Sequence, residues 1–374
     1  MLVENEKIGH LEHIDLVMVK LPFVSPFGTS VQVWSHKEAL LLRLESDGLV
    51  AWGECVADPD PFYLPETTQT AKHIIRDFLL PQVEPGLTLA EVMQRFHHVR
   101  GHNIAKATVE NALIHLAALR NGVPLHAMLG FPPKKILSGI SIGLKNTREE
   151  LLQAVERAVA KKYHRVKMKI KKGQDVDWVR AVRERFPDIA LMADANGDYA
   201  LSDMHLLQEL DAFHLTMIEQ PLGYSDIYQH SILQKELRTA ICLDESILTL
   251  EDAATAIALG ACRIINIKQG RVGGLLESIR IARYAMDHGI GVWSGGMDET
   301  GIGRAVNIHL QTAPGFTIAG DTSETANYFH QDIAHPPVVL DADGFIAIPP
   351  GPGLGITVDP DLLMKYMIGW EHLR

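Results

Sequence analysis

Short apolar runs recur along the middle of the chain, and each run ends in a charged residue. The runs span Val166–Lys169, Ile189–Asp194, Leu215–Glu219, Ala240–Asp244 and Ile264–Lys268. Their charged ends are spaced 25, 25, 25 and 24 residues apart, and helical patterns fill the intervals. About 25 residues suit one strand, one helix and two short loops. The pattern predicts a parallel β/α barrel in which all five charged ends meet at one mouth.

The same repeat continues on both sides of these runs. Residues 136–144 predict a first strand, and residues 289–296 and 316–321 predict a seventh and an eighth. The helix after the first strand repeats apolar residues on one face, at Leu151, Leu152, Val155, Ala158 and Val159. This amphipathic pattern is typical of a helix that covers a barrel.

The region before the barrel has a different pattern. Apolar runs within residues 11–56 predict antiparallel strands, and the turn Ser46-Asp47-Gly48 joins the last two as a hairpin. Helical patterns follow at 66–80, 88–100 and 104–121. The tail at 338–359 again predicts β structure around an Asp343-Gly344 turn, and we expect it to return to the N-terminal region.

Composition narrows the possible partners. The chain has 374 residues, enough for a barrel and a second domain, and its net charge of −11 argues against nucleic-acid binding. No apolar run approaches the roughly 18 residues of a membrane span, and the charged start is unlike a signal segment. Cys55, Cys242 and Cys262 are odd in number, so we expect free thiols in a reducing cytoplasm.

Three of the charged strand ends are acids: Asp194, Glu219 and Asp244. They offer hard oxygen ligands, which favour Mg²⁺ or Mn²⁺ over zinc. The alternative for any one acid is a pair with Lys or Arg, or a helix cap. Three acids on successive strand ends favour the metal interpretation for the set.

The lysines suggest the chemistry. In Lys167-Met168-Lys169 the two lysines project to the same side of a strand, where they meet a substrate or, in the alternative, solvent. Lys268 lies four strands away and should approach from the opposite wall. A divalent cation and a second ammonium group nearby should lower its pKa. Two bases facing each other across a metal-bound carboxylate suit removal of the proton α to that carboxylate.

Several motifs together carry a family resemblance: Lys167-Met-Lys169, Asp194-Ala-Asn196, Glu219-Gln-Pro221, Asp244-Glu245-Ser246 and Lys268-Gln-Gly-Arg271. They resemble the muconate-lactonizing subgroup of the enolase superfamily. Within it, the run Gly295–Arg304 resembles o-succinylbenzoate synthases and N-acylamino acid racemases. The mandelate racemase branch would need a His near 292–295, and dipeptide epimerases tend to have a second acid beside Asp321; the sequence has neither.

The resemblance implies a role for each of these residues. Asp194, Glu219 and Asp244 would bind Mg²⁺, with Mn²⁺ as a substitute, Lys169 and Lys268 would be the catalytic pair, Lys167 would orient them, and Asn196 and Glu245 would support the site. The resemblance also implies the reaction, a syn dehydration of 2-succinyl-6-hydroxy-2,4-cyclohexadiene-1-carboxylate in menaquinone biosynthesis. The alternative is racemisation of N-acyl, perhaps N-succinyl, amino acids, or both activities. A non-catalytic metal-binding barrel and a metal hydrolase fit less well, since neither needs two opposed lysines.

We therefore expect a (β/α)₇β modified TIM barrel at residues 131–337, an α+β capping domain at 1–130, and a C-terminal segment at 338–374 that completes the capping domain. The partners should be a small carboxylate substrate and further copies of the same chain, as a homo-oligomer.

Other residues are expected near the substrate: Ser25, Ser141, Gly295, Gly296 and Met297. Arg271 could contact an acyl carboxylate, tune Lys268 or form a surface salt bridge. The segments 23–29 and 55–63 are expected to close over the mouth as a lid, although ordinary hairpin connections would look similar. Asp298 stands where the resemblance predicts an apolar residue, and Lys171-Lys172 also departs from the pattern, so both affect the expected substrate preference.

Overall fold

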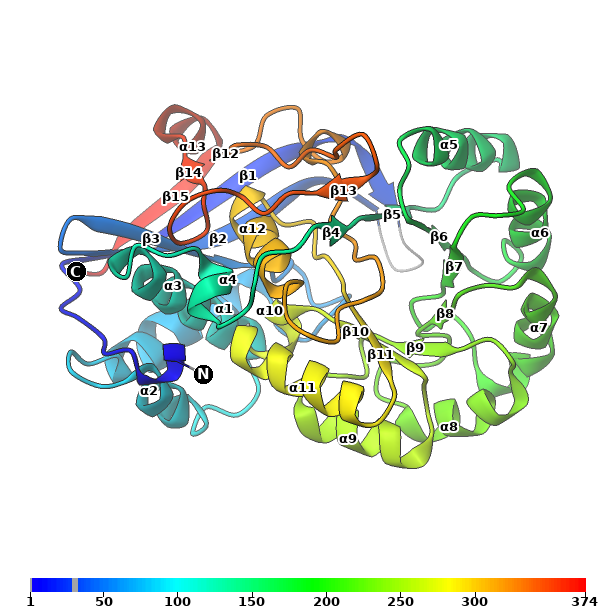
Figure 1. The fold of residues 1–374 in the computed structure, drawn as a ribbon, viewed down its shortest axis with the longest axis horizontal. Coiled ribbons are helices and arrows are strands. Elements are labelled where there is room, and N and C mark those ends of the chain that lie inside the picture. The colour runs from blue at the N-terminus through cyan, green and yellow to red at the C-terminus, as the bar shows by residue number, and fades with distance from the viewer. Residues whose placement is uncertain (1, 29–32) are drawn as a thin grey trace.

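An antiparallel sheet of four strands forms one end of the molecule (Figure 1). The computed structural model describes residues 2–28 and 33–374. The sheet has the order β15-β1-β2-β3, and its strands are β1 (His13–Gly28), β2 (Val33–Ser46), β3 (Leu49–Cys55) and β15 (Met367–His372). Ser46 pairs with Leu49 across a two-residue turn in which Asp47 and Gly48 both have positive φ, 53° and 72°. This geometry confirms the predicted hairpin.

Helices pack against this sheet and confirm the predicted helical patterns. They are α1 (Thr68–Ile74), α2 (Leu89–Phe96), α3 (Asn103–Arg120) and α4 (Leu125–Met128), with single turns η1 (Leu2–Asn5), η2 (Ile75–Leu79) and η3 (Leu80–Gln82). A reciprocal hydrogen-bonded pair of Thr88 and Glu91 caps the start of α2. Most of α3 is buried, because it lies between the sheet and the barrel.

Seven parallel strands curl into the barrel in the order β11-β10-β9-β8-β7-β6-β5 (Figure 1). They are β5 (Gly139–Ile142), β6 (Arg165–Lys169), β7 (Leu191–Asp194), β8 (Ile218–Glu219), β9 (Ile241–Leu243), β10 (Ile264–Ile267) and β11 (Gly291–Ser294). Each coincides with a predicted apolar run, except that β6 begins one residue earlier, so the repeat and the modified TIM barrel are confirmed.

Helices alternate with these strands and cover the outside of the barrel. They are α5 (Arg148–Ala160), α6 (Val176–Arg185), α7 (Met204–Glu209), α8 (Ile227–Glu236), α9 (Leu250–Leu259), α10 (Gln269–Val272), α11 (Leu275–Asp287) and α12 (Gly301–Leu310), with the single turns η4 (Leu201–Asp203) and η5 (Leu210–Phe213). In α5 Leu151, Val155 and Ala158 are buried as predicted, whereas Leu152 is only partly buried and Val159 is exposed.

The predicted eighth strand at 316–321 is wrong. This segment forms only isolated parallel bridges, Val292 with Phe316 and Ser138 with Gly320, so it lies between β11 and β5 without becoming a strand. Glycine explains the irregular path: Gly315 has a φ of 95°, and a Cβ on Gly320 would lie 2.4 Å from the Gln311 side chain.

The prediction of a loop at 23–29 is also wrong for residues 23–28, the part that the structure describes. Residues 23–28 belong to β1, which pairs with β2 up to Gly28 beyond an irregularity after Pro22. Thr29 lies outside the described residues. This end of β1 is therefore a strand arm beside the barrel and not a hairpin connection.

The C-terminal part of the chain touches both regions. The described elements after α12 are η6 (Thr325–Asn327), β12 (Ala334–His335), β13 (Phe345–Ile346), β14 (Thr357–Val358), α13 (Pro360–Tyr366) and β15. β13 pairs with β4 (Ile136–Leu137), next to the first barrel strand, whereas β15 pairs with β1. The exact domain boundaries stay a prediction.

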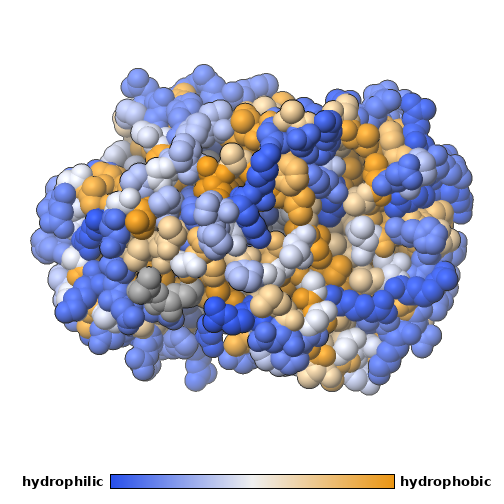
Figure 2. All heavy atoms as spheres, viewed as in Figure 1, coloured by the Kyte–Doolittle hydropathy of each residue, from blue (hydrophilic) through white to orange (hydrophobic). Residues whose placement is uncertain are grey.

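Apolar side chains from neighbouring barrel strands form a buried cluster. Met192, Met217, Cys242, Ile264 and Trp293 form one buried cluster, and the indole of Trp293 donates to the Cys242 sulfur at 3.3 Å. All three cysteines are buried free thiols, as predicted. In Figure 2, hydrophilic side chains predominate around the outline of the molecule. Within the described part of the chain, no helix combines the length and apolar character that a membrane span needs.

Candidate active site

The strand ends bring the predicted acids side by side. Lys169 pairs in register with Asp194, and Asp194 pairs with Glu219 on the next strand. Asp244 follows the end of β9 by one residue. All three acids are buried. Parallel strands deliver their carboxyl ends to one mouth, so adjacent registers place these carboxylates together.

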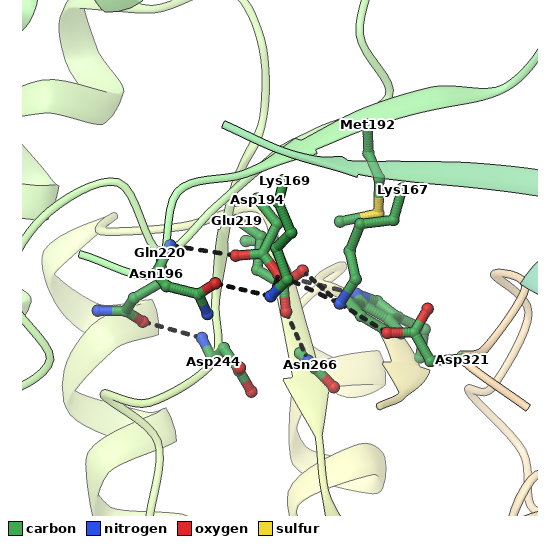
Figure 3. A network of polar contacts seen from close by, with 12 residues as sticks. Lys167, Lys169, Met192, Asp194, Asn196, Glu219, Gln220, Asp244, Asn266 and Asp321 are labelled. Atoms are coloured by element: carbon green, nitrogen blue, oxygen red, sulfur yellow. Dashed lines mark hydrogen bonds and ion pairs between the residues drawn. The ribbon is translucent and has the colours of Figure 1, made fainter. Parts of the chain in front are cut away.

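Both lysines of β6 point into this cluster (Figure 3). The ammonium nitrogens of Lys169 and Lys167 lie 2.6 and 3.3 Å from the Asp194 carboxylate, while Met168 packs in the hydrophobic core. Strand alternation explains this division. The alternative in which Lys167 and Lys169 face solvent is wrong, since both are at least nine-tenths buried.

Glu219 and Asp244 are each held by several donors. Lys167 donates to Glu219 at 3.1 Å and the Asn266 amide donates to it at 2.6 Å. The Lys268 ammonium lies 2.9 Å from Asp244, which also accepts hydrogen bonds from Arg271 and Tyr63. Every acid of the set is therefore paired with cationic or neutral donors.

The acids repel one another in spite of these partners. Burial raises the pKa of Glu219, Asp194 and Asp244 raise it further, and Lys167 only partly offsets them, so it reaches about 8. Burial also acts on Asp194, but Lys169 and Lys167 hold the pKa of this carboxyl below its usual value. Such mutual repulsion marks a site that favours a positive charge between its carboxylates.

The donor set fits a hard divalent cation in its chemistry, because buried carboxylates on adjacent strand ends are the ligands that Mg²⁺ and Mn²⁺ prefer. Their present positions do not form a ready cage: among residues 2–28 and 33–374, no three His, Cys, Asp or Glu side chains are grouped as metal ligands. The ammonium groups on Asp194 and Asp244 explain the difference, since a cation would compete with them for the same oxygens.

Lys169 and Lys268 line one cavity of about 80 Å³ between the barrel mouth and the capping region. They come from strands four apart in the sheet order, β6 and the end of β10. The other described lining residues include Lys167, Asn196, Tyr63, Asp321, Ser141, Gly296 and Met297. A bound molecule here would touch both lysines.

The chain's own charges raise the pKa of Lys268, and the predicted fall, which depends on a bound divalent cation, stays a prediction. Burial lowers the pKa of Lys268, but Asp244 and Glu245 raise it by more than burial and Arg271 lower it, so it lies above its usual value. The contact with Asp244, 2.9 Å from the Lys268 ammonium group, offsets the effect of positive neighbours.

Two of the expected supporting residues meet beside Lys169. The Asn196 amide oxygen accepts a hydrogen bond from Lys169 at 2.6 Å, and its amide nitrogen donates to Glu245 at 3.0 Å. Burial raises the pKa of Glu245 to about 7, and Asp244 adds to the shift. Asn196 thus connects Lys169 to a buried acid.

Arg271 is not on the surface, so the interpretation as a surface salt bridge is wrong. It is buried behind Asp244, where it donates to that carboxylate and, at 2.9 Å, to the Ile247 carbonyl. Arg271 is not among the cavity-lining residues and contacts the acid that holds Lys268.

The remaining residues that were expected near the substrate lie in different places. Ser141, Gly296 and Met297 line the cavity with the lysines, whereas Ser25 lines a neighbouring cavity of about 250 Å³. Gly295 lines neither of these cavities: a Cβ there would lie 2.3 Å from the Asn266 side chain. Gly295 therefore permits the close packing that aims Asn266 at Glu219.

Two contributors, Asp321 and Asn266, were given no role from the sequence, whereas Tyr63 ends the segment 55–63 that was expected to close over the mouth and lines the cavity with Asp58 and Pro59. Asp321 accepts from Lys167 at 2.6 Å and from Arg165 at 2.5 Å, and Tyr63 contacts Lys268 at 2.5 Å. Asn266 stands two residues before Lys268, so strand alternation could have found it. Tyr63 belongs to the N-terminal region, and no repeat links it to the barrel.

Comparison with known proteins agrees with this geometry. Residues 150–362 match the family described as enolase C-terminal domain-like, and residues 13–130 match the mandelate racemase/muconate lactonizing enzyme N-terminal domain. The chain belongs to the enolase superfamily, whose members generally depend on a metal. The resemblance and the fold predicted from sequence are both confirmed.

Similar proteins carry two different names. An o-succinylbenzoate synthase of Geobacillus kaustophilus is 45% identical over 360 residues, which cover 96% of each chain. An N-succinylamino acid racemase of Amycolatopsis sp is 42% identical over 94% of this chain and 96% of the relative. A crystal structure of an enolase superfamily member from Listeria innocua has a TM-score of 0.93 at 39% identity and covers 98% of this chain and 100% of its own.

Proposed function

We propose that this chain is an o-succinylbenzoate synthase, a lyase that dehydrates 2-succinyl-6-hydroxy-2,4-cyclohexadiene-1-carboxylate in menaquinone biosynthesis. The observation that carries the proposal is the pair Lys169 and Lys268, which line one cavity beside three buried carboxylates. The names of several relatives at 40–45% identity, over nearly the whole chain, support the same reaction.

The reaction breaks a C–H and a C–O bond and aromatises the ring. One lysine, as the neutral amine, removes the proton α to the carboxylate and delivers it to the departing hydroxyl on the same face, so that water leaves. The second lysine, as an ammonium ion, stabilises the enediolate. Lys167 and Asn196 would fix the positions of the acids and of Lys169 through the contacts described above.

Asp194, Glu219 and Asp244 would hold Mg²⁺, with Mn²⁺ able to replace it. When bound, the cation acts as a Lewis acid that stabilises negative charge on the substrate carboxylate. Chelation of divalent cations should abolish dehydration, Mg²⁺ or Mn²⁺ should restore it, and recovery with Zn²⁺ alone would contradict the assignment.

Two opposed lysines also suit a second activity, racemisation of N-succinylamino acids. One lysine would remove the α-proton and the other would return a proton to the opposite face. Several similar proteins bear this name. Incubation with N-succinylamino acids in D₂O should label the α-carbon if the activity is present, and fast dehydration without labelling would assign a dedicated synthase.

The two-lysine assignment makes a direct prediction. Lys169→Ala and Lys268→Ala should each lower kcat for dehydration by at least about 10³-fold, because each removes a group that acts in the transition state. Titration calorimetry should show that Mg²⁺ still binds. Lys135→Ala, at an exposed residue paired with Asp341, is the matched control. Substantial turnover in either active-site variant would contradict the assignment.

A further inference from the structure

Asp298 places an acid in the wall of the catalytic cavity. It lines the same cavity as Lys169 and Lys268. Its backbone is left-handed, with a φ of 55°, a conformation that Asp and Asn tolerate better than most residues. Its carboxylate forms no hydrogen bond or ion pair within 4 Å to another described residue, so it remains available to a bound molecule.

The nearest candidate partner, Lys37, is already engaged. Its ammonium group is buried and donates to the carbonyls of Val56 at 3.1 Å and Met297 at 3.0 Å. It also lies 3.6 Å from Asp58. Two of its three N–H donors are thus used by backbone carbonyls, its nearest acid is Asp58, and it attracts Asp298 only at longer range.

The other acids around Lys37 face protein groups. Glu54 accepts from the Thr300 backbone at 2.9 Å, and Glu299 accepts from the Asn307 amide at 2.8 Å. Glu38 also lines the cavity, but it pairs with Lys20 at 2.8 Å. Asp298 is thus the acid at this end of the cavity whose carboxylate no described side chain binds.

The neighbouring cavity has a basic lining. Phe23, Ser141 and Tyr328 line both this cavity and the neighbouring one of about 250 Å³. The described lining of the second cavity contains Lys145, Arg157 and Lys161 and no acid. Lys161 pairs with Glu324 at 2.5 Å, so Lys145 and Arg157 are the cations in this lining that favour the negative end of an acyl group, which Asp298 repels.

These charges orient an N-succinylamino acid. With its α-carbon between Lys169 and Lys268, its succinyl carboxylate would point past Ser141 toward the basic cavity. The amino acid side chain is left to face Asp298. A terminal amine there would gain a charge-assisted hydrogen bond in a partly dry site, whereas an apolar side chain would leave the carboxylate desolvated and unpaired.

We propose that Asp298 makes this enzyme selective for N-succinylamino acids whose side chain ends in a cation, such as the lysine derivative. The inference rests on the second activity proposed above. Norleucine is the matched comparison, because its side chain is that of lysine without the amine.

The test compares α-proton exchange in D₂O for N-succinyl-L-lysine and N-succinyl-L-norleucine by proton NMR. The wild-type protein should prefer the lysine derivative at least about tenfold in kcat/KM. Asp298→Asn, which keeps the size and tolerates the left-handed backbone, should lower that ratio at least about tenfold, mainly by raising KM for the lysine derivative. Glu38→Gln removes a paired acid from the same cavity and should keep the ratio.

The proposal would be overturned if the wild-type kcat/KM were about equal for the lysine and norleucine derivatives, or if Asp298→Asn left the ratio of the two values unchanged. The dehydration assay, run on the same preparations, separates the two hypotheses. Dehydration without exchange of either amino acid derivative would overturn the selectivity proposal and leave the synthase function standing. Exchange of the amino acid derivatives without dehydration would overturn the synthase function and leave the selectivity proposal to be decided by the measured ratio.

Discussion

Single residues at the mouth act through a dense network of opposite charges. Lys167 shows this best, because its ammonium group contacts Asp194, Glu219 and Asp321 within 3.3 Å. Burial lowers the pKa of Lys167, but these three acids outweigh burial and hold it well above the usual value. Lys167 therefore stays an ammonium ion and is suited to orienting the acids, not to taking a proton.

Asp321 should be essential for this network. Asp321→Asn would leave Arg165 and Lys167 with one counter-charge fewer in a buried site, which costs about 3–5 kcal/mol of unfolding free energy. Urea denaturation monitored by circular dichroism measures the loss. Asp341→Asn breaks an exposed pair with Lys135 and should lower the unfolding free energy much less, because solvent screens exposed pairs. Similar small losses in both variants would show that Asp321 is not needed.

At the scale of elements, the strand ends fix the positions of the chemical groups. Gly295 follows β11 directly and packs against Asn266 of β10, which donates to Glu219. Gly295→Ala would place a methyl group 2.3 Å from the Asn266 oxygen. We expect an overpacking cost of about 1–3 kcal/mol in stability and lower turnover as Asn266 moves.

Gly223→Ala is the matched control for that variant, because a Cβ there meets no atom within 4 Å. Thermal unfolding and dehydration kinetics on both variants check the prediction. If Gly295→Ala behaved like Gly223→Ala in both measurements, the close contact would not position Asn266.

Periodicity explains how much could be predicted from sequence. Alternation and a 25-residue interval located seven strands and set Lys169 beside Asp194 and Glu219, because these features depend on local geometry. They failed at 316–321, where glycine and long-range packing replace a strand by isolated bridges. The alternative of a surface salt bridge for Arg271 failed for a similar reason, because its buried position depends on the turn after β10, whereas the expected influence on Lys268 agrees with the structure.

At the scale of the whole molecule, the N-terminal region attaches to the barrel through buried glutamates at helix starts. Glu54 of β3 accepts from backbone N–H groups at the start of α12, and Glu110 of α3 accepts from Leu275 at the start of α11. Helix N-termini favour such acceptors. Tyr63, which contacts Asp244 and Lys268, is a third link from this region and reaches the catalytic groups themselves. No spacing in the sequence predicts these contacts, since they join segments more than 150 residues apart.

Glu110 should make the stability of this attachment depend on pH. Burial raises the pKa of Glu110 from 4.5 to about 8, and backbone hydrogen bonds offset only part of that shift. The folded protein therefore holds this proton when the unfolded chain has lost it. The stability that Glu110 contributes is fully present below about pH 4.5 and is lost as the pH rises through about 8.

The comparison with Glu110→Gln isolates this contribution, because glutamine does not titrate. The difference in unfolding free energy, wild type minus variant, should fall steadily between about pH 4.5 and pH 8. Urea denaturation at several pH values measures it. Glu91→Gln, at an exposed helix cap whose carboxyl has a lowered pKa, should not show this fall, because its linkage has the opposite sign. A flat difference for Glu110→Gln would mean that Glu110 stays ionised in the interface, stabilised by the start of α11.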